Sequence, residues 1–143
     1  MSADFAALLL LSFVAFAIGV GPMIADFNKT HATNPLWIPH PRFHVVWQCL
    51  VQLGVSSFAL SLLWLWPSKL HTWMAVFLNY NWMVMFLVTA LAMPLYGGAL
   101  ADENGIKPLE FNIGGKIHKI DTNVFGACIL FILNTIAVYL LLR

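Results

Sequence analysis

Phe5–Ile24, FAALLLLSFVAFAIGVGPMI, is a run of residues without a single Asp, Glu, Lys or Arg. Roughly 20 apolar residues suffice to cross the hydrocarbon core of a bilayer as a helix. Three further uncharged runs of comparable length follow, at 43–66, 72–93 and 124–142. Backbone groups in hydrocarbon must hydrogen-bond internally, and none of these runs alternates like a strand. We therefore predict an all-α membrane protein, a four-transmembrane-helix bundle in which residues 1–143 form a single domain.

The composition supports a multi-pass membrane protein. The chain is 61% hydrophobic and 9% charged, whereas about a quarter of the residues of an average soluble domain are charged. Its net charge of +1 and lack of a long basic run exclude the electrostatic signature of nucleic-acid binding. The first run is expected to stay as a helix, because acidic Asp4 stands where a signal peptide carries basic residues.

Four crossings divide the connections between the two sides of the membrane. Residues 25–42 and 94–123 fall on one side, while both termini and the turn after Pro67 fall on the other. The first side has five Lys and Arg residues against two on the second: Lys29, Arg42, Lys107, Lys116 and Lys119, against Lys69 and Arg143. The positive-inside rule therefore predicts that the long connections are cytoplasmic.

The third connection contains the pattern of a β-hairpin. In Leu109–Ile120, LEFNIGGKIHKI, two short alternating segments flank Gly114-Gly115, a pair suited to a two-residue turn. The expected register pairs Ile113 with Lys116, Phe111 with His118 and Glu110 with Lys119. We predict a small hairpin lying over the helix ends, followed by Asp121 or Thr122 as the N-cap of the last helix.

Between the first two runs lies Thr30–His44, THATNPLWIPHPRFH, which holds three of the five histidines. Its prolines stiffen the backbone, and Pro41 suits the first turn of a helix. A helix that begins at Pro41 would have His40 directly before its first turn. His44, Gln48 and Gln52 would then follow at four-residue intervals on one face.

Amide side chains recur at mid-membrane depth. Asn79, Asn81 and Asn134 each lie well inside an apolar run. A buried amide in lipid needs a partner, so these residues should face the bundle interior or a wet cavity. One interpretation is a ligand-binding role, and the other is hydrogen bonding between helices.

These polar residues define a candidate site at the membrane boundary. The candidate catalytic residues are His40, His44, Arg42 and Asp26. The candidate metal ligands are His31, His40, His44, His118 and Asp121, a set of imidazoles and a carboxylate that suits zinc or iron. The candidate substrate-binding residues are Gln48, Gln52, Trp37, Trp47, Asn81 and Asn134. The alternative is that these groups serve as helix caps, loop hydrogen bonds and headgroup contacts.

The segment Ala25–Gln48, ADFNKTHATNPLWIPHPRFHVVWQ, resembles a signature of small, largely uncharacterised four-helix membrane proteins. In that family Asp, His, Asn-Pro, Trp and Pro-His-x-Arg-Phe-His follow the first helix. The resemblance implies the same four-helix layout and names no reaction. It marks the importance of eight residues here, which are Asp26, His31, Asn34, Pro35, Trp37, His40, Arg42 and His44.

Two functional classes follow from the site, and the sequence leaves open whether the protein is an enzyme. The first is a small membrane enzyme acting on a lipid, isoprenoid, sterol or quinone-type substrate by acid/base or metal-assisted chemistry. The second is a non-catalytic accessory or ligand-binding subunit of a larger membrane complex. The expected partners are the lipid bilayer, a hydrophobic small molecule, and another membrane protein or a second copy of the chain. A transporter ranks last, because the apolar runs hold no charged residue.

Overall fold

The computed structural model describes residues 2–101 and 104–143, and these form four long helices and one two-stranded antiparallel hairpin. The elements in order are α1 (Ala3–Asp26), α2 (Pro39–Trp64), α3 (Lys69–Tyr96), β1 (Leu109–Ile113), β2 (Lys116–Ile120) and α4 (Thr122–Leu141). Each helix is long and apolar enough to cross a membrane. The predicted fold class, an all-α four-helix bundle with a hairpin in the third connection, is confirmed. The protein is accordingly described as a multi-pass integral membrane protein.

The helix boundaries differ from the predicted runs by one to four residues, and two of the differences involve prolines. Helix α2 begins at Pro39, before the predicted start at Pro41, because Ile38 is an extended N-cap and a proline fits the first helical positions. Helix α3 continues through Pro94 and ends at Tyr96, and its C-cap Gly97 has a φ of 67°, the left-handed conformation typical of a helix C-terminus. His40 therefore lies inside the first turn of α2.

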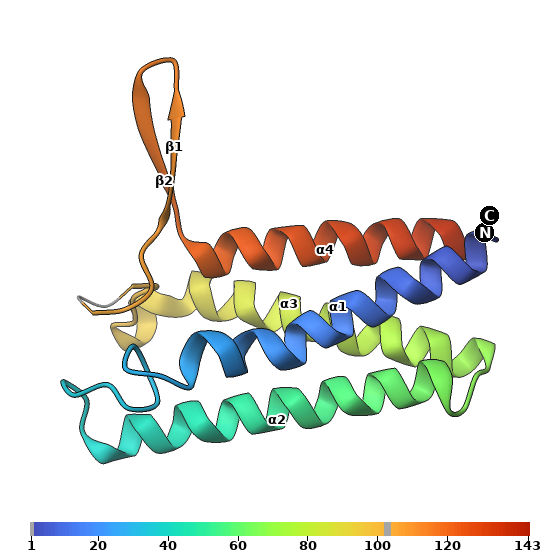
Figure 1. Cartoon of the computed structure of the whole chain (residues 1–143), viewed down its shortest axis with the longest axis horizontal. Coiled ribbons are helices and arrows are strands. Elements are labelled where there is room, and N and C mark those ends of the chain that lie inside the picture. Colours follow the sequence, from blue (N-terminus) through green and yellow to red (C-terminus); the bar gives the residue numbers. More distant parts are fainter. Residues whose placement is uncertain (1, 102–103) are drawn as a thin grey trace.

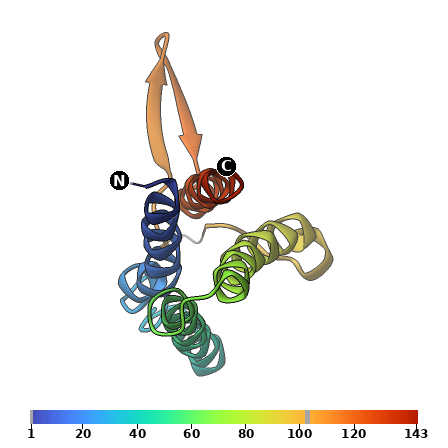
Figure 2. The same cartoon turned by 90° about the vertical axis from the view of Figure 1, so that its right-hand side faces the viewer.

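The arrangement of the ends agrees with four crossings. Both termini and the short α2–α3 turn lie at one end of the bundle, and the two longer connections lie at the other (Figure 1). Viewed along the bundle, α1 lies between α2 and α4, and α3 stands to one side (Figure 2). Helix α1 contacts all three other helices. The compartment that the long connections face stays a prediction.

Small side chains hold the helices close together. Every helix contributes at least one alanine to the main buried cluster: Ala7 and Ala15 from α1, Ala59 from α2, Ala75 from α3 and Ala137 from α4. Helices α1 and α2 approach closely at Gly19, where an added Cβ atom would stand 2.7 Å from Cβ of Ser56. Lipid tails are as apolar as these helices, so van der Waals contact between small residues, with interhelical hydrogen bonds, must provide much of the association energy.

One pair of amides links three helices at the centre of the bundle. Nδ2 of Asn79 donates to Oδ1 of Asn134 at 3.1 Å and to the backbone carbonyl of Leu11 at 3.3 Å. Both asparagine side chains are buried. This geometry supports the interhelical interpretation for Asn79 and Asn134.

The hairpin has the predicted register, with Glu110 opposite Lys119 and Phe111 opposite His118. Nζ of Lys119 lies 2.8 Å from Oε1 of Glu110. The hydrogen bond and positive charge of Lys119 lower the pKa of the Glu110 carboxyl, and the same contact raises the pKa of Lys119. Asp121 caps α4 as predicted, by accepting from two backbone N–H groups. The hairpin extends sideways from the start of α4 instead of lying over the helix ends (Figure 1).

The close approach at Gly19 predicts that Gly19→Ala will destabilise the bundle. The new methyl group would overlap Ser56, whose Cβ cannot move without its backbone, and overpacking of this kind costs about 1–3 kcal/mol. Gly54→Ala is the matched control, because a Cβ atom there meets nothing within 4 Å. Unfolding followed by circular dichroism in detergent should show the loss for the first variant alone. Equal stability of both variants would contradict tight α1–α2 packing.

Candidate functional site

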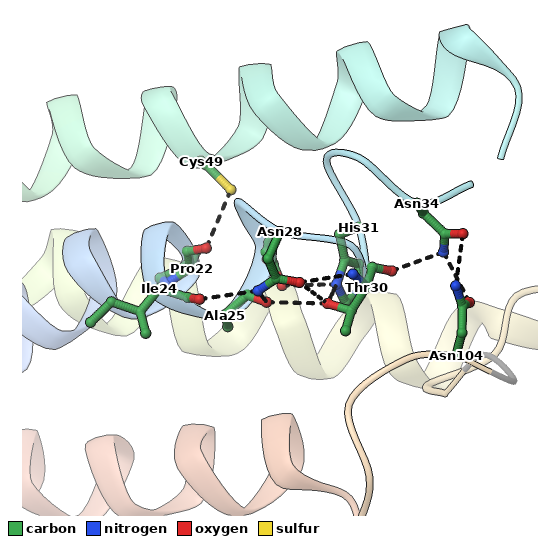
Figure 3. Close-up of polar contacts among 10 residues, drawn as sticks. Pro22, Ile24, Ala25, Asn28, Thr30, His31, Asn34, Cys49 and Asn104 are labelled. Atoms are coloured by element: carbon green, nitrogen blue, oxygen red, sulfur yellow. Dashed lines mark hydrogen bonds and ion pairs between the residues drawn. The ribbon is translucent and has the colours of Figure 1, made fainter. Parts of the chain in front are cut away.

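The connection from α1 to α2 is folded by side-chain hydrogen bonds to its own backbone. Asn28 closes the end of α1 by donating to the carbonyls of Ile24 and Ala25, at 3.3 and 2.8 Å. Its Oδ1 accepts from both the backbone N–H and the hydroxyl of Thr30. Figure 3 shows this network continuing to Asn34. The loop is therefore held by polar contacts as well as by its prolines.

Asn34 joins this loop to the connection that follows α3. Its amide and that of Asn104 hydrogen-bond reciprocally, at 3.1 and 3.0 Å (Figure 3). Asn34 also donates to the carbonyl of Thr30 and accepts from the backbone N–H of Leu36. The residue is 0% exposed, and all four hydrogen bonds expected of an amide side chain are made. The two long connections are thus fastened to each other.

The folded loop brings His31 back onto the end of α1, beside Asp26. Nδ1 of His31 lies 3.3 Å from Oδ1 of Asp26 and 2.8 Å from the hydroxyl oxygen of Thr30. Trp37 packs against the imidazole edge to face, with ring centroids 5.4 Å apart. Both members of the Asp26–His31 pair are only partly exposed. The sequence hypothesis placed these two residues in the same site, and the structure brings them together.

The surroundings of Nδ1 select one tautomer of the His31 ring. The Thr30 hydroxyl can donate its hydrogen to Oδ1 of Asn28, 2.7 Å away, or to the carbonyl of Ala25, 3.3 Å away, and its oxygen can then accept from Nδ1 of His31. The Asp26 carboxylate is an acceptor as well, so the proton of a neutral imidazole belongs on Nδ1. Nε2 then carries the lone pair.

Asp26 and His31 line a cavity of about 390 Å³ at the loop end of the bundle, which we call the mouth cavity. All four helices contribute to its wall. The lining residues include Gly21 and Ala25 of α1, Gln48 and Gln52 of α2, Trp82 and Phe86 of α3, and Thr122 and Asn123 of α4. Gln48 and Gln52 were predicted to bind substrate, and their side chains do line a cavity.

A second cavity of about 310 Å³, the lateral cavity, lies between α2 and α3 with Ile18 of α1 in its wall. It shares four lining residues with the mouth cavity: Gln48, Gln52, Trp82 and Phe86. Val51, Val55 and Met85 line it and are also exposed on the outer surfaces of their helices. The lateral cavity therefore reaches the lipid-facing surface of the bundle.

Two polar atoms at the lateral cavity lack a partner within the protein. Oε1 of Gln52 and Oγ of Ser56 are buried, and no hydrogen bond to either is made by the described part of the chain. Both side chains line the cavity, one helical turn apart, and Asn81 lines it from α3. A buried polar group without a partner costs about 1–3 kcal/mol, so these atoms call for a ligand or water.

His40 and His44 form a separate pair on the outer face of α2. Their Nε2 atoms lie 3.0 Å apart, because both residues belong to the helix and are one turn apart. The pair continues into an aromatic row, in which Phe43 stacks on Trp47 at 6.3 Å. All four side chains are exposed, and none lines the mouth cavity or the lateral cavity. The predicted polar stripe on α2 is thus divided: His44 lies on the outer face of the helix, whereas Gln48 and Gln52 line the two cavities.

The other candidate residues lie apart from both pairs. His118 is exposed on the hairpin, Asp121 caps α4, and Asn134 is fully buried against Asn79. Nε of Arg42 is buried without a hydrogen bond. Within residues 2–101 and 104–143, no three His, Cys, Asp or Glu side chains gather closely enough to hold one metal ion. The five predicted ligands therefore do not come together: His40 and His44 form a pair, His31 lies beside Asp26, and His118 and Asp121 lie elsewhere.

Sequence reasoning missed several residues that build the site. Asn104 has no motif around it, and only the fold brings it to Asn34 across 70 residues of chain. Trp82 and Phe86 belong to an apolar run in which most of the side chains are suited to face lipid. Thr122 was considered only as a helix cap, although it lines the mouth cavity and its hydroxyl donates to the carbonyl of Lys107.

The Asn34 network predicts that Asn34→Ala will loosen the loop that carries His31. Four hydrogen bonds disappear, each of which contributes about 1 kcal/mol, so local opening should become at least about tenfold more frequent. Hydrogen exchange of the Leu36 and Trp37 amides measures this. Asn112→Ala is the control, because the Asn112 amide bonds only to the turn of the hairpin. Unchanged exchange in Asn34→Ala would show that the prolines alone hold the loop.

Comparison with known proteins gives a family and no activity. Residues 10–108 match DUF6640, a family of unknown function, and this match includes most of α1, all of α2 and α3, and the loop with Asp26 and His31. No curated protein and no solved structure matches the chain. The matched part is more than half of the 143 residues. The chain belongs to the DUF6640 family.

Proposed function

We propose that this protein is a small membrane enzyme in which His31 is the acid/base group and Asp26 orients it. The substrate is a lipid, isoprenoid, sterol or quinone-type molecule. The observation that carries the proposal is the position of the Asp26–His31 pair in the wall of the mouth cavity. This cavity shares Gln48 and Gln52 with the lateral cavity, which opens toward lipid. A hydrophobic substrate could enter sideways between α2 and α3 without leaving the bilayer.

The chemistry follows from the tautomer of His31. With the proton on Nδ1, the Nε2 lone pair can accept a proton from a hydroxyl group or from a carbon next to a carbonyl group. The carboxylate of Asp26 stabilises the imidazolium that results, and Nε2 returns the proton in a later step. General acid/base catalysis of this type contributes about 10²–10⁴-fold to a rate.

The side chains of Gln52 and Ser56 orient the substrate. Gln52 offers a buried oxygen that lacks a partner, and Ser56 offers a hydroxyl group one turn deeper. A polar head with a hydroxyl or carbonyl group would satisfy them, while the apolar remainder contacts Trp82 and Phe86. The two cavities have volumes of about 310 and 390 Å³, within the range of about 300–1,000 Å³ for small-molecule sites.

This proposal predicts that His31→Gln will abolish turnover without unfolding the protein. Membranes containing equal amounts of folded wild type or variant should differ in at least one hydrophobic metabolite, which accumulates in the variant while its product declines. Untargeted mass spectrometry of the lipid extract measures both species. Loss of the base should reduce turnover about 100-fold or more. His118→Gln is the matched control, because His118 is exposed on the hairpin.

Identical lipid profiles for wild type and His31→Gln would overturn acid/base catalysis by His31. Gln52→Leu separates binding from catalysis, since it removes the cavity amide and leaves the Asp26–His31 pair intact. We expect a hydrophobic molecule to co-purify with wild type and to be lost in Gln52→Leu. Ser57→Ala is its control, because the Ser57 hydroxyl bonds to the Leu53 carbonyl and does not line the lateral cavity.

The outward face of α2 favours a second candidate, a binding or accessory subunit of a membrane complex. His40, Phe43, His44 and Trp47 are exposed together, as residues that contact a partner would be. Nε2 atoms 3.0 Å apart can also both reach one zinc or iron ion, because bonds of about 2.0–2.1 Å place two imidazole nitrogens roughly 3 Å apart. Arg42, in the same turn, would then hold an anionic group with its unpaired Nε.

For this second candidate, His44→Ala should reduce both bound metal and partner co-purification, whereas His31→Gln should leave them unchanged. Elemental analysis and cross-linking in native membranes measure the two quantities. His71→Ala serves as the control, because that histidine lies at the opposite end of the bundle in the first turn of α3. Equal metal content and equal cross-linking in wild type and His44→Ala would refute a role for the outward pair.

A further inference from the structure

We propose that the β1–β2 hairpin lies flat on the bilayer surface, with the face that carries Phe111 and Ile113 in the lipid headgroup region. The hairpin extends sideways from the bundle in both views (Figures 1 and 2). The helices define the membrane normal because they cross the bilayer. The hairpin joins α4 at the N-terminal end of that helix and extends across the helix direction. It therefore runs along the membrane surface. This inference is independent of the proposed enzymatic function.

The strand register assigns each side chain to one of two faces. Directly paired residues share a face, and successive pairs alternate between faces. One face carries the pairs 109–120, 111–118 and 113–116, and we call it the Phe111 face. Its side chains are Leu109, Phe111, Ile113, Lys116, His118 and Ile120. The opposite face carries Glu110, Asn112, Ile117 and Lys119.

A contact with α4 shows which face is directed toward the membrane. Phe111 packs against Phe125 in the first turn of α4, with ring centroids 6.1 Å apart. Since α4 descends into the bilayer from this point, the Phe111 face is the one turned toward the lipid. The Glu110–Lys119 ion pair belongs to the opposite face, which is turned toward water.

The composition of the two faces fits this orientation. The Phe111 face has four apolar side chains, and Ile113 at its tip is 65% exposed within the protein. Insertion into the headgroup region would remove this apolar surface from water. Lys116 and His118 can extend to lipid phosphates from the same face, as basic side chains at membrane surfaces commonly do. Ile117 is the one apolar side chain directed to water among residues 109–120.

Adjacent residues on opposite faces provide the test. A single cysteine at Ile113 or at Asn112, in a Cys49→Ala/Cys128→Ala background, is labelled with an environment-sensitive fluorophore. The full-length protein is placed in nanodiscs of phosphatidylcholine and phosphatidylglycerol, with and without spin-labelled lipid as a quencher. We expect blue-shifted, lipid-quenched emission at position 113 and water-like, unquenched emission at position 112. The same alternation is expected between Phe111 and Glu110.

Water-like emission at both positions would overturn the proposal and indicate that the hairpin stands in water, available to a protein partner. Equal lipid quenching at both positions would also overturn it, because a flat hairpin cannot present both faces to lipid. Nuclear Overhauser contacts between residues 111 and 118 show that the labelled hairpin is still formed. Lys116→Glu supplies a second measurement: it should weaken quenching at position 113 in the anionic nanodiscs, whereas Lys119→Glu, on the water face, should not.

Discussion

Close contact between small side chains holds this bundle together, because a bilayer offers apolar helices no advantage in leaving lipid. Helix α1 contains alanines at 7 and 15 and a glycine at 19, and it makes the most extensive contacts in the bundle, with α2 and α4. At Gly19 the approach to Ser56 leaves no room even for a methyl group. The mouth cavity lies toward the loop end, and the lateral cavity extends between α2 and α3 as far as Ser56 and Ala59, so close packing and a cavity occur on different faces of α2 at the same depth.

Amide groups within the membrane have two different roles in this protein. Asn79 donates to Asn134 and joins helices, which offsets part of their cost in lipid, although Nδ2 of Asn134 has no partner in the described part of the chain. Gln52 keeps a buried oxygen without a partner, and it lines both cavities. Amide side chains at similar depth in the membrane therefore join helices at Asn79 and Asn134 but line a cavity at Gln52. The difference depends on whether a second amide stands opposite.

The candidate site was only partly predictable from the sequence. The family resemblance of Ala25–Gln48 indicated that Asp26 and His31 matter, and the four-residue spacing placed Gln48 and Gln52 on one face of α2. His40 and His44 were the favoured catalytic residues because their motif is prominent, yet both lie on the outer surface. The spacing along a helix shows which residues share a face, but it does not show whether that face is directed to a cavity or to lipid. His31 was harder to rank, since its loop is positioned by the distant residue Asn104.

Four helices, their approximate ends, the hairpin register and the Asp121 cap follow from the sequence by itself, because each depends on interactions between residues near one another in the chain. Tertiary structure alone decided that α3 lies to one side of α1, α2 and α4, that cavities lie between the helices, and that the hairpin extends sideways. It also decided which histidine lies beside a carboxylate at a cavity and which pair faces outward. These features depend on how helix faces pair, and nearly uniform apolar sequences allow many pairings that only close packing can distinguish.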